Sequence, residues 1–414
     1  MKFGKFISLT VISVILSGCG NDIVVTNQTQ QTEISFSWWG NDARHDYTLE
    51  AIAEFERLHP EIKVKCHYSE WSGYQSRNNV QMVSHTESDV MQINYAWISQ
   101  YSHDGKGYYD ISQLGDYFDF SNFTEEDLEY GMQNGSLNAI PIALNTMTVY
   151  INETIYNDYG LEIPKTFDDF FEAAKVMNGE CYPISMSAKS SWFFITSYVG
   201  QMKNKNFMDN EGNILFDKSD IQLMIETYCN LVNKKVIPQV EHFEKSEIAS
   251  GNYAGVLAWL SDAKSYLGGA IDKGYKITVA DYTTVDGNLQ SWYAKPATMY
   301  AIRKDIEHPE EATILLDYLL NSTEMAGYQE IEKGIPISSS QRKYLEENEL
   351  LDGIQYDAFT KMNDNKEKLE VISPYFENES MIDAFIAVCN EVLYGKSGAE
   401  EQAEELYKTL TSLV

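Results

Sequence analysis

The side chains best suited to binding chemistry in this sequence are aromatic. The 414-residue chain contains 28 tyrosines and seven tryptophans, and aromatic residues make up 13% of it. An indole or phenol ring is a flat apolar plate that can cover the C–H face of a sugar ring while its N–H or O–H still finds a partner. Aromatic richness is therefore expected of sugar-binding clefts, but a large hydrophobic core needs it too.

Motifs for catalysis or metal binding are missing from the sequence. It has no GxSxG or HExxH pattern, and 209–212 (DNEG) does not continue into an EF-hand loop. The run 395–397 (GKS) resembles the end of a phosphate-binding loop, but Asn390 occupies the position of the required first glycine. The sequence thus predicts no enzyme, metal or cofactor.

The cysteines downstream of residue 19 are scattered and form no CxxC pair, so zinc and redox motifs are unsupported. They are Cys66, Cys181, Cys229 and Cys389. We expect free, buried thiols, while one or two disulfides are the alternative outside the cell.

The N-terminus has the pattern of a secretion signal. Lys2 and Lys5 precede an apolar stretch, 6–16, that is too short to span a bilayer, for which about 20 residues are needed. The following 16–19 (LSGC) resembles the bacterial lipobox, in which the cysteine is acylated and becomes the first residue. We expect a signal peptide over 1–18, lipidation at Cys19 and a polar tether to residue 32.

Composition bounds the rest of the chain. Roughly 380 residues remain after the tether, which exceeds one typical core and suggests two lobes. The net charge of −31 argues against a nucleic-acid partner. No oligomerisation segment is evident, so we expect a monomer.

The elements that must position a site alternate between strands and helices. Residues 33–39 and 62–68 alternate as strands, and we expect Asp46 to cap a helix between them, which gives a right-handed βαβ unit. A third strand is predicted over 89–93. The region is therefore an α/β lobe with a parallel sheet.

Further along, two extended segments suggest crossings between lobes. The first is 139–145 and the second is 276–282. Thr166 and Asp169 form a capping-box pattern at the start of a helix. A strand is predicted over 297–303, a helix from Pro309 onward, and a last helix from Ser397.

In this order, the segments resemble the extracellular solute-binding proteins of sugar-type ABC importers, the group that contains maltose-binding protein. The pieces that carry the resemblance are 35–64, 88–101, 134–177, 308–324, 333–338 (KGIPIS) and 393–406. No single piece is diagnostic, but their order behind a lipobox is specific.

The resemblance implies an α/β, two-lobed periplasmic-binding-protein-like fold with a hinge of crossing strands. Lobe one is expected over 33–143 plus 282–325, and lobe two over 144–281 plus 326–414, with crossings at 143–145 and 281–283. It also implies capture of a carbohydrate by closure of the lobes, and delivery to the membrane permease subunits of an ABC importer. The protein is expected outside the cytoplasm, lipid-anchored to the bacterial membrane through Cys19.

The resemblance also selects candidate ligand contacts, because strand ends and crossing segments face the cleft in this family. They are Trp39, Asn41, Asp42, Arg44, Tyr74, Asn94, Tyr95, Trp97, Asn145, Trp192, Trp259, Asp262, Trp292 and Tyr293. Trp71 and Tyr74 lie on an expected loop, where Tyr74 is the preferred wall residue. The family's usual Gly-x-Trp after the lobe-two strand is replaced here by 259–262 (WLSD), which leaves open whether Trp259 or Asp262 faces the ligand.

Two other functions are compatible with parts of this pattern. A surface glycosidase would need two positioned carboxylates, which 62 acidic residues cannot identify by sequence alone. The same fold could bind a polyamine, which would need clustered carboxylates in place of the mixed aromatic, amide and arginine candidates.

Overall fold

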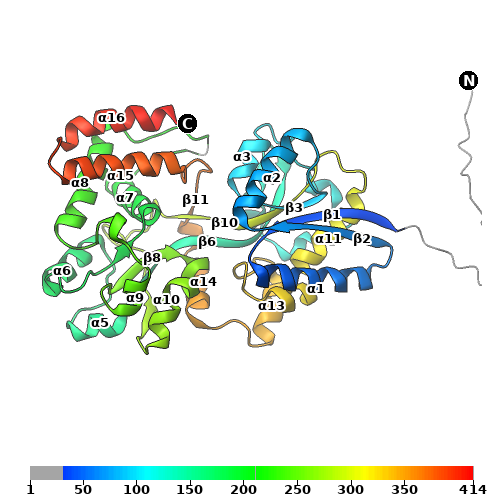
Figure 1. Ribbon diagram of the computed structural model, residues 1–414, viewed down its shortest axis with the longest axis horizontal. Helices are drawn as coiled ribbons and strands as arrows, with labels where there is room; N and C mark the ends of the chain where they lie inside the picture. The colour runs from blue at the N-terminus through cyan, green and yellow to red at the C-terminus, as the bar shows by residue number, and fades with distance from the viewer. Residues whose placement is uncertain (1–30, 210, 414) are drawn as a thin grey trace, which may run out of the picture.

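The computed structural model describes residues 31–209 and 211–413, which form two lobes lying side by side (Figure 1). The predicted signal peptide, the lipidated Cys19 and nearly all of the predicted tether lie outside these residues. The predicted two-lobed α/β architecture is confirmed.

Lobe one contains both the N-terminal elements and a later group of helices. Its elements are β1 (Thr32–Trp39), α1 (Asp42–Leu58), β2 (Ile62–Ser69), α2 (Trp71–Ser84), β3 (Val90–Ile93), α3 (Ala96–Tyr101), α4 (Glu125–Glu129), β4 (Met132–Gln133), β5 (Ser136–Leu137), α11 (Pro309–Asn321), α12 (Thr323–Gln329) and α13 (Ser339–Glu347). In Figure 1, α2 and α3 cover one face of its sheet, and α1, α11 and α13 lie on the other.

Lobe two is built from the middle of the chain and its C-terminal helices. Its elements are α5 (Glu153–Asp158), α6 (Phe167–Met177), β7 (Ser185–Met186), α7 (Ala188–Lys203), α8 (Lys218–Asn233), α9 (Ser246–Ser250), β8 (Gly255–Trp259), α10 (Ala263–Asp272), β9 (Ile277–Val279), α14 (Gly353–Asp364), β11 (Glu370–Val371), α15 (Glu379–Leu393) and α16 (Ala399–Ser412).

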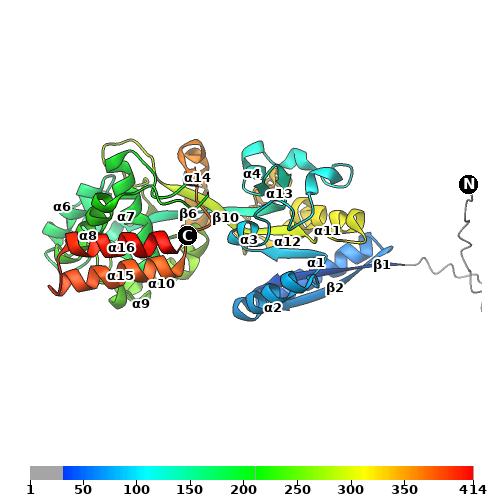
Figure 2. The same cartoon turned by 90° about the horizontal axis from the view of Figure 1, so that it is seen from above.

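Two long strands, β6 (Ala139–Asn152) and β10 (Tyr293–Ile302), pass between the lobes (Figure 2). They pair antiparallel with each other, and β6 then continues into lobe two, where it pairs with β8 and β9. The strand order β2-β1-β3-β10-β6-β8-β7 makes one hydrogen-bonded sheet that runs through both lobes. Every residue of β6 is buried, as expected for a strand covered on both faces.

The local predictions agree with the structure in most places. β1 and β2 pair in parallel around α1, which confirms the βαβ unit. Thr166 and Asp169 form the predicted capping box at α6. The first helix, however, begins five residues earlier than predicted, because the Asn41 side chain accepts a hydrogen bond from the Arg44 amide at 3.0 Å and caps it. Asp46 is therefore inside α1 and does not cap it.

The boundaries between the lobes also differ from those predicted. The first crossing, 143–145, lies in the middle of β6. The predicted second crossing at 281–283 remains in lobe two, since Tyr282 packs in the core of that lobe, and the chain crosses later along β10. Helices α12 and α13 pack against α1 and α11, so the chain returns to lobe two only between α13 and α14. The predicted return at residue 326 is too early.

The thiols at positions 66, 181, 229 and 389 are free in the structure, as expected. All but Cys66 are buried, and burial raises the pKa of Cys181 and of Cys229 to about 11. Their protonated thiols therefore act as small apolar groups in the core.

Candidate binding groove

A groove between the lobes is formed by three adjoining pockets. The central pocket, about 580 Å³, lies between Trp71 and Trp97 of lobe one and Lys189 and Glu377 of lobe two. It shares Trp71 and Asn94 with a second pocket of about 290 Å³, which we call the arginine pocket because Arg44 lines it. Shared lining residues make these two hollows continuous.

The third hollow extends the groove at its other end. This tyrosine pocket has a volume of about 410 Å³ and is lined by Tyr95, Tyr130 and Tyr375, among others. It shares Tyr95 and Tyr375 with the central pocket. The three hollows therefore form one continuous groove lined by residues of both lobes.

Lobe one presents an aromatic wall to the central pocket. The rings of Trp71 and Trp97 are stacked with centroids 5.8 Å apart and planes 13° from parallel, and Trp39 meets Trp71 edge-on at 4.9 Å. Trp71 is 39% exposed, whereas Trp97 is 3% exposed. Trp71 is thus the plate that a ligand ring can cover, and its neighbours fix its orientation.

Tyr74 supports this wall from behind rather than lining it. Its side chain is buried, and its hydroxyl donates to the Gln92 carbonyl oxygen at 2.7 Å. Trp71 begins α2, so Tyr74 lies one turn further along and points toward the core. Of the pair on the expected loop, the structure therefore places Trp71 in the groove, and the preference for Tyr74 is corrected.

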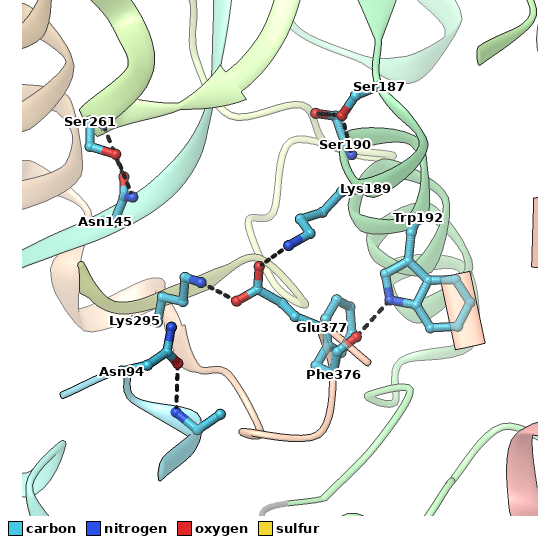
Figure 3. A network of polar contacts seen from close by, with 11 residues as sticks. Asn94, Asn145, Ser187, Lys189, Ser190, Trp192, Ser261, Lys295, Phe376 and Glu377 are labelled. Atoms are coloured by element: carbon cyan, nitrogen blue, oxygen red, sulfur yellow. Dashed lines mark hydrogen bonds and ion pairs between the residues drawn. The ribbon is translucent and has the colours of Figure 1, made fainter. Parts of the chain in front are cut away.

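Lobe two presents a cluster of charges to the same pocket (Figure 3). Lys189 lies 3.3 Å from Glu377, and Lys295 donates a hydrogen bond to the same carboxylate. Ser187 caps α7 and thereby fixes Lys189 in its first turn. Burial raises the pKa of Glu377, but the two lysines outweigh that effect and the pKa is lowered. Glu377 is therefore held as a carboxylate.

Lys295 also lies over the ring of Trp259, 4.5 Å from its centroid. The Trp259 ring also packs edge-on against Phe193. Trp259 does not line any of the three pockets, and in this structure it orients a groove cation rather than facing a ligand.

The arginine pocket combines groups from both lobes and from β10. Arg44 and Lys333 line it from lobe one, Thr298 from β10, and Asp262 from the turn after β8. Burial raises the pKa of Asp262, partly offset by surrounding cations that include Arg44. Burial, with a smaller contribution from Arg44, lowers the pKa of Lys333 to about 7.

Asn145 positions one lip of this pocket. Its amide nitrogen donates to Ser261 Oγ at 2.9 Å, and its amide oxygen accepts from the Ser261 backbone N–H at 3.1 Å. This pair joins β6 to the turn that carries Asp262 (Figure 3). Asn145 is 5% exposed, so its role in this structure is to hold that turn.

Several predicted contacts lie away from the groove. Asn41 and Asp42 form the exposed start of α1, outside the three pockets. Trp192 is fully buried in lobe two, where its indole N–H donates to the Phe376 carbonyl oxygen at 3.0 Å. Trp292 and Tyr293 are in the same core. Trp292 donates its indole N–H to the Met147 carbonyl oxygen at 2.9 Å, and the Tyr293 ring packs against Phe376, so the expectation that they face the cleft is corrected.

The structure brings together the other predicted residues. Those that line the groove are Trp39, Arg44, Asn94, Tyr95, Trp97 and Asp262. The residues missed are Lys189, Lys295, Lys333, Glu377 and Tyr375. Lys333 had a sequence signal, since it opens the KGIPIS segment, but the other three charges come from segments far apart in the chain.

Within residues 31–209 and 211–413, no group of three or more histidine, cysteine or acidic side chains could hold a metal ion. Across that part of the chain, no helix is both long enough and apolar enough to cross a bilayer.

Comparison with solved structures identifies relatives that share the whole architecture. A periplasmic oligogalacturonide-binding protein from Yersinia enterocolitica matches with a TM-score of 0.79 and 29% identity, over 92% of this chain and 98% of that one. A de novo designed cysteine esterase matches with a TM-score of 0.86 and 29% identity, over 93% and 98%.

A curated relative is the multiple sugar-binding protein of Streptococcus mutans. It is 24% identical over 198 residues, a region that spans 46% of this chain and 46% of the relative. The match thus extends over about half of the relative's length.

The family model for bacterial extracellular solute-binding proteins matches residues 41–326. That region contains both crossing strands and most residues of the aromatic wall and the arginine pocket. The chain therefore belongs to the bacterial extracellular solute-binding protein family.

Proposed function

We propose that this protein captures a carbohydrate outside the cytoplasm and delivers it to an ABC importer. The observation that carries the proposal is the exposed Trp71 ring, which faces the charged groups of lobe two across an elongated groove. The ring can cover the C–H face of a sugar, while lysine and carboxylate groups opposite it can bond to hydroxyls. The sugar-binding and oligogalacturonide-binding relatives support this assignment.

Closure of the lobes is the proposed working motion. The groove is lined from both lobes, and across residues 31–209 and 211–413 the chain passes between them along β6, along β10 and between α13 and α14. A ligand that contacts both walls stabilises the closed arrangement by its differential affinity for that state. The closed shape is what the permease subunits would recognise. Lipidation at Cys19 and a monomeric state are part of the same proposal.

The two alternative functions are less consistent with the groove. A polyamine site would need clustered free carboxylates, whereas Glu377 is already bonded to two lysines and the arginine pocket sets Arg44 and Lys333 beside a single carboxylate, Asp262. A glycosidase needs a protonated carboxyl group as acid, and the two lysines that keep Glu377 ionised remove this residue as a candidate for that role.

A binding screen with the purified protein tests the proposal. Mono- and oligosaccharides, with spermidine and amino acids as controls, are added while thermal unfolding is followed. A ligand at 100 times its dissociation constant should add about 2.7 kcal/mol to the free energy of unfolding. Stabilisation by saccharides alone, without hydrolysis, is the expected result. Stabilisation by spermidine alone, or release of smaller sugars, would contradict it.

A further inference from the structure

The arginine pocket holds two cations that lack a carboxylate partner. Neither Arg44 nor Lys333 lies within 4.0 Å of an acidic oxygen in the described part of the chain, although the whole protein carries a net charge of −31. By contrast, both lysines of the central pocket bond to Glu377. Other cations of the described chain also lack an acidic partner, but these two share one pocket and Lys333 is buried there, which calls for an explanation.

Lys333 is the more informative of the two because it is buried. Lys333 is 3% exposed, and its ammonium group donates a hydrogen bond to the Tyr300 hydroxyl at 2.7 Å. An ammonium group has three donors, and a buried cation without an anion is costly. Burial of the Lys333 ammonium group is therefore expected to lower the free energy of unfolding, so stability alone does not explain this lysine.

The remaining polar groups of the pocket are also incompletely bonded. Arg44 donates from one terminal nitrogen to the Glu332 carbonyl oxygen at 2.6 Å, while its buried Nε has no partner among the described residues. The buried Thr298 hydroxyl likewise has none within that part of the structure. Arg44, Lys333 and Thr298 therefore bring hydrogen-bond donors from three segments to one pocket, and these donors are not all used within the described structure.

The backbone around Lys333 is built to hold it there. Gly334 has a φ of +96°, and a Cβ at this position would lie 2.8 Å from the Ala143 Cβ, so only glycine fits. The next residues bond to β6, since the Ile337 amide donates to the Ile142 carbonyl oxygen at 3.1 Å. The backbone that carries Lys333 is therefore held against β6, which fixes the position of this lysine relative to the hinge.

We propose that Arg44, Lys333 and Thr298 form a carboxylate subsite that binds the acidic group of a uronic-acid-containing saccharide. This inference rests on the proposed function, because it names the class of sugar that the groove takes. The guanidinium group can bond a carboxylate through two parallel N–H groups, and the ammonium and hydroxyl groups supply further donors. Asp262, on the lobe-two lip, bonds neither cation, so it leaves an excess positive charge in the pocket and can accept from a sugar hydroxyl.

The test compares sugars that differ only in the acidic group. Binding of trigalacturonate, its fully methyl-esterified form and the neutral raffinose to the full-length protein is measured by calorimetry. Trigalacturonate should bind at least tenfold more tightly than its ester. Lys333→Met and Arg44→Gln should each weaken trigalacturonate binding by about 10-fold to 100-fold and leave binding of the ester unchanged.

Lys343→Met is the matched control, because Lys343 is an exposed lysine on the same lobe whose loss changes the net charge equally. It should bind trigalacturonate normally. Circular dichroism and the unfolding midpoint check that each variant is folded. Should Lys333→Met fail to fold, Arg44→Gln and Thr298→Val still test the subsite.

The possible failures are distinguishable. Equal binding of the acid and its ester, or of raffinose alone, would overturn the carboxylate subsite and leave carbohydrate capture standing. Equal weakening of acid and ester in Lys333→Met would also overturn it, since that pattern indicates a structural role. No binding of any saccharide would overturn the proposed function and this inference with it.

Discussion

The two lobes differ in where most of their tryptophans lie. In lobe one, Trp39, Trp71 and Trp97 are gathered at the groove. In lobe two, Trp192 and Trp292 are buried, and each bonds through its indole N–H to a backbone carbonyl within the molecule. Lobe one also buries Trp38 in its core, but its other three tryptophans line the groove, whereas neither of these two lobe-two rings does.

The charges of the groove show the same contrast. Lobe two presents Lys189 and Glu377, and the Glu377 carboxylate bonds to both Lys189 and Lys295, which leaves this cluster with one net positive charge. Lobe one presents Arg44 and Lys333, whose donors are incompletely used. We therefore propose that lobe one carries most of the ligand-contacting surface, while lobe two supplies a preformed polar wall. The predictions below test that division.

The largest effect is expected in lobe two and should be on stability. Trp192→Ala removes a fully buried ring and its hydrogen bond to Phe376, and should lower the free energy of unfolding by about 3–5 kcal/mol. Denaturant unfolding measures this loss, and the fraction that remains folded should bind ligand with normal affinity. A folded variant of normal stability that no longer binds would place this tryptophan in the site and break the comparison.

The corresponding change in lobe one should act on binding instead. Trp71→Ala removes the exposed plate and should weaken saccharide binding by about 1–3 kcal/mol, with less than about 1 kcal/mol lost in stability. Calorimetry gives the affinity. Tyr394→Ala is the control, since Tyr394 is a 64% exposed aromatic residue outside the groove. Equal affinities of the Trp71 variant and the parent would show that the aromatic wall does not contact the ligand.

A smaller effect concerns pH and the buried Lys333. Its pKa of about 7 means that it is cationic below that value and neutral above it. Trigalacturonate favours the cation, so its affinity should fall roughly tenfold between pH 6.5 and 8, whereas that of the ester should not. Calorimetry at several pH values measures the slope.

Other groups that face Lys333 must be separated from this effect. They are Arg44 and Tyr47 on α1, Tyr300 on β10 and Asp262 from lobe two. Burial raises the pKa of both tyrosines, so they remain neutral in this range. The slope should disappear in Lys333→Met. A slope that survives in that variant would assign the titration to another group.

The smallest effect is expected from the charge cluster of lobe two. Glu377→Gln leaves two lysines without their carboxylate and should lower stability by about 1 kcal/mol at neutral pH. The two lysines lower the pKa of Glu377 despite its burial, so this increment is present above about pH 4.5 and is lost as the pH falls further. Acid unfolding of parent and variant should therefore converge at low pH. Parallel curves at all pH values would contradict the assignment.

The sequence supported the fold better than the site. The alternation in 33–39 and 62–68 specifies strands, because an alternating strand buries one face of its side chains. Beyond the end of a strand, alternation no longer predicts which side chains are buried. Whether Trp71 or Tyr74 faces the groove depends on where α2 begins, which alternation does not indicate. The cluster of Lys189, Lys295 and Glu377 joins three distant segments, and no local pattern indicates which of 62 acidic residues meets which lysine.

The interleaved path of the chain also governs the order in which the protein can form. The central sheet of lobe one needs β10, where Ile302 pairs with Val90, and lobe two needs α16 to cover α8. Neither lobe can complete its core until most of the chain has been synthesised, so formation depends on contacts between residues far apart in sequence. Such contacts slow folding. Lobe two in particular can reach its final shape only after α16 is available to cover α8.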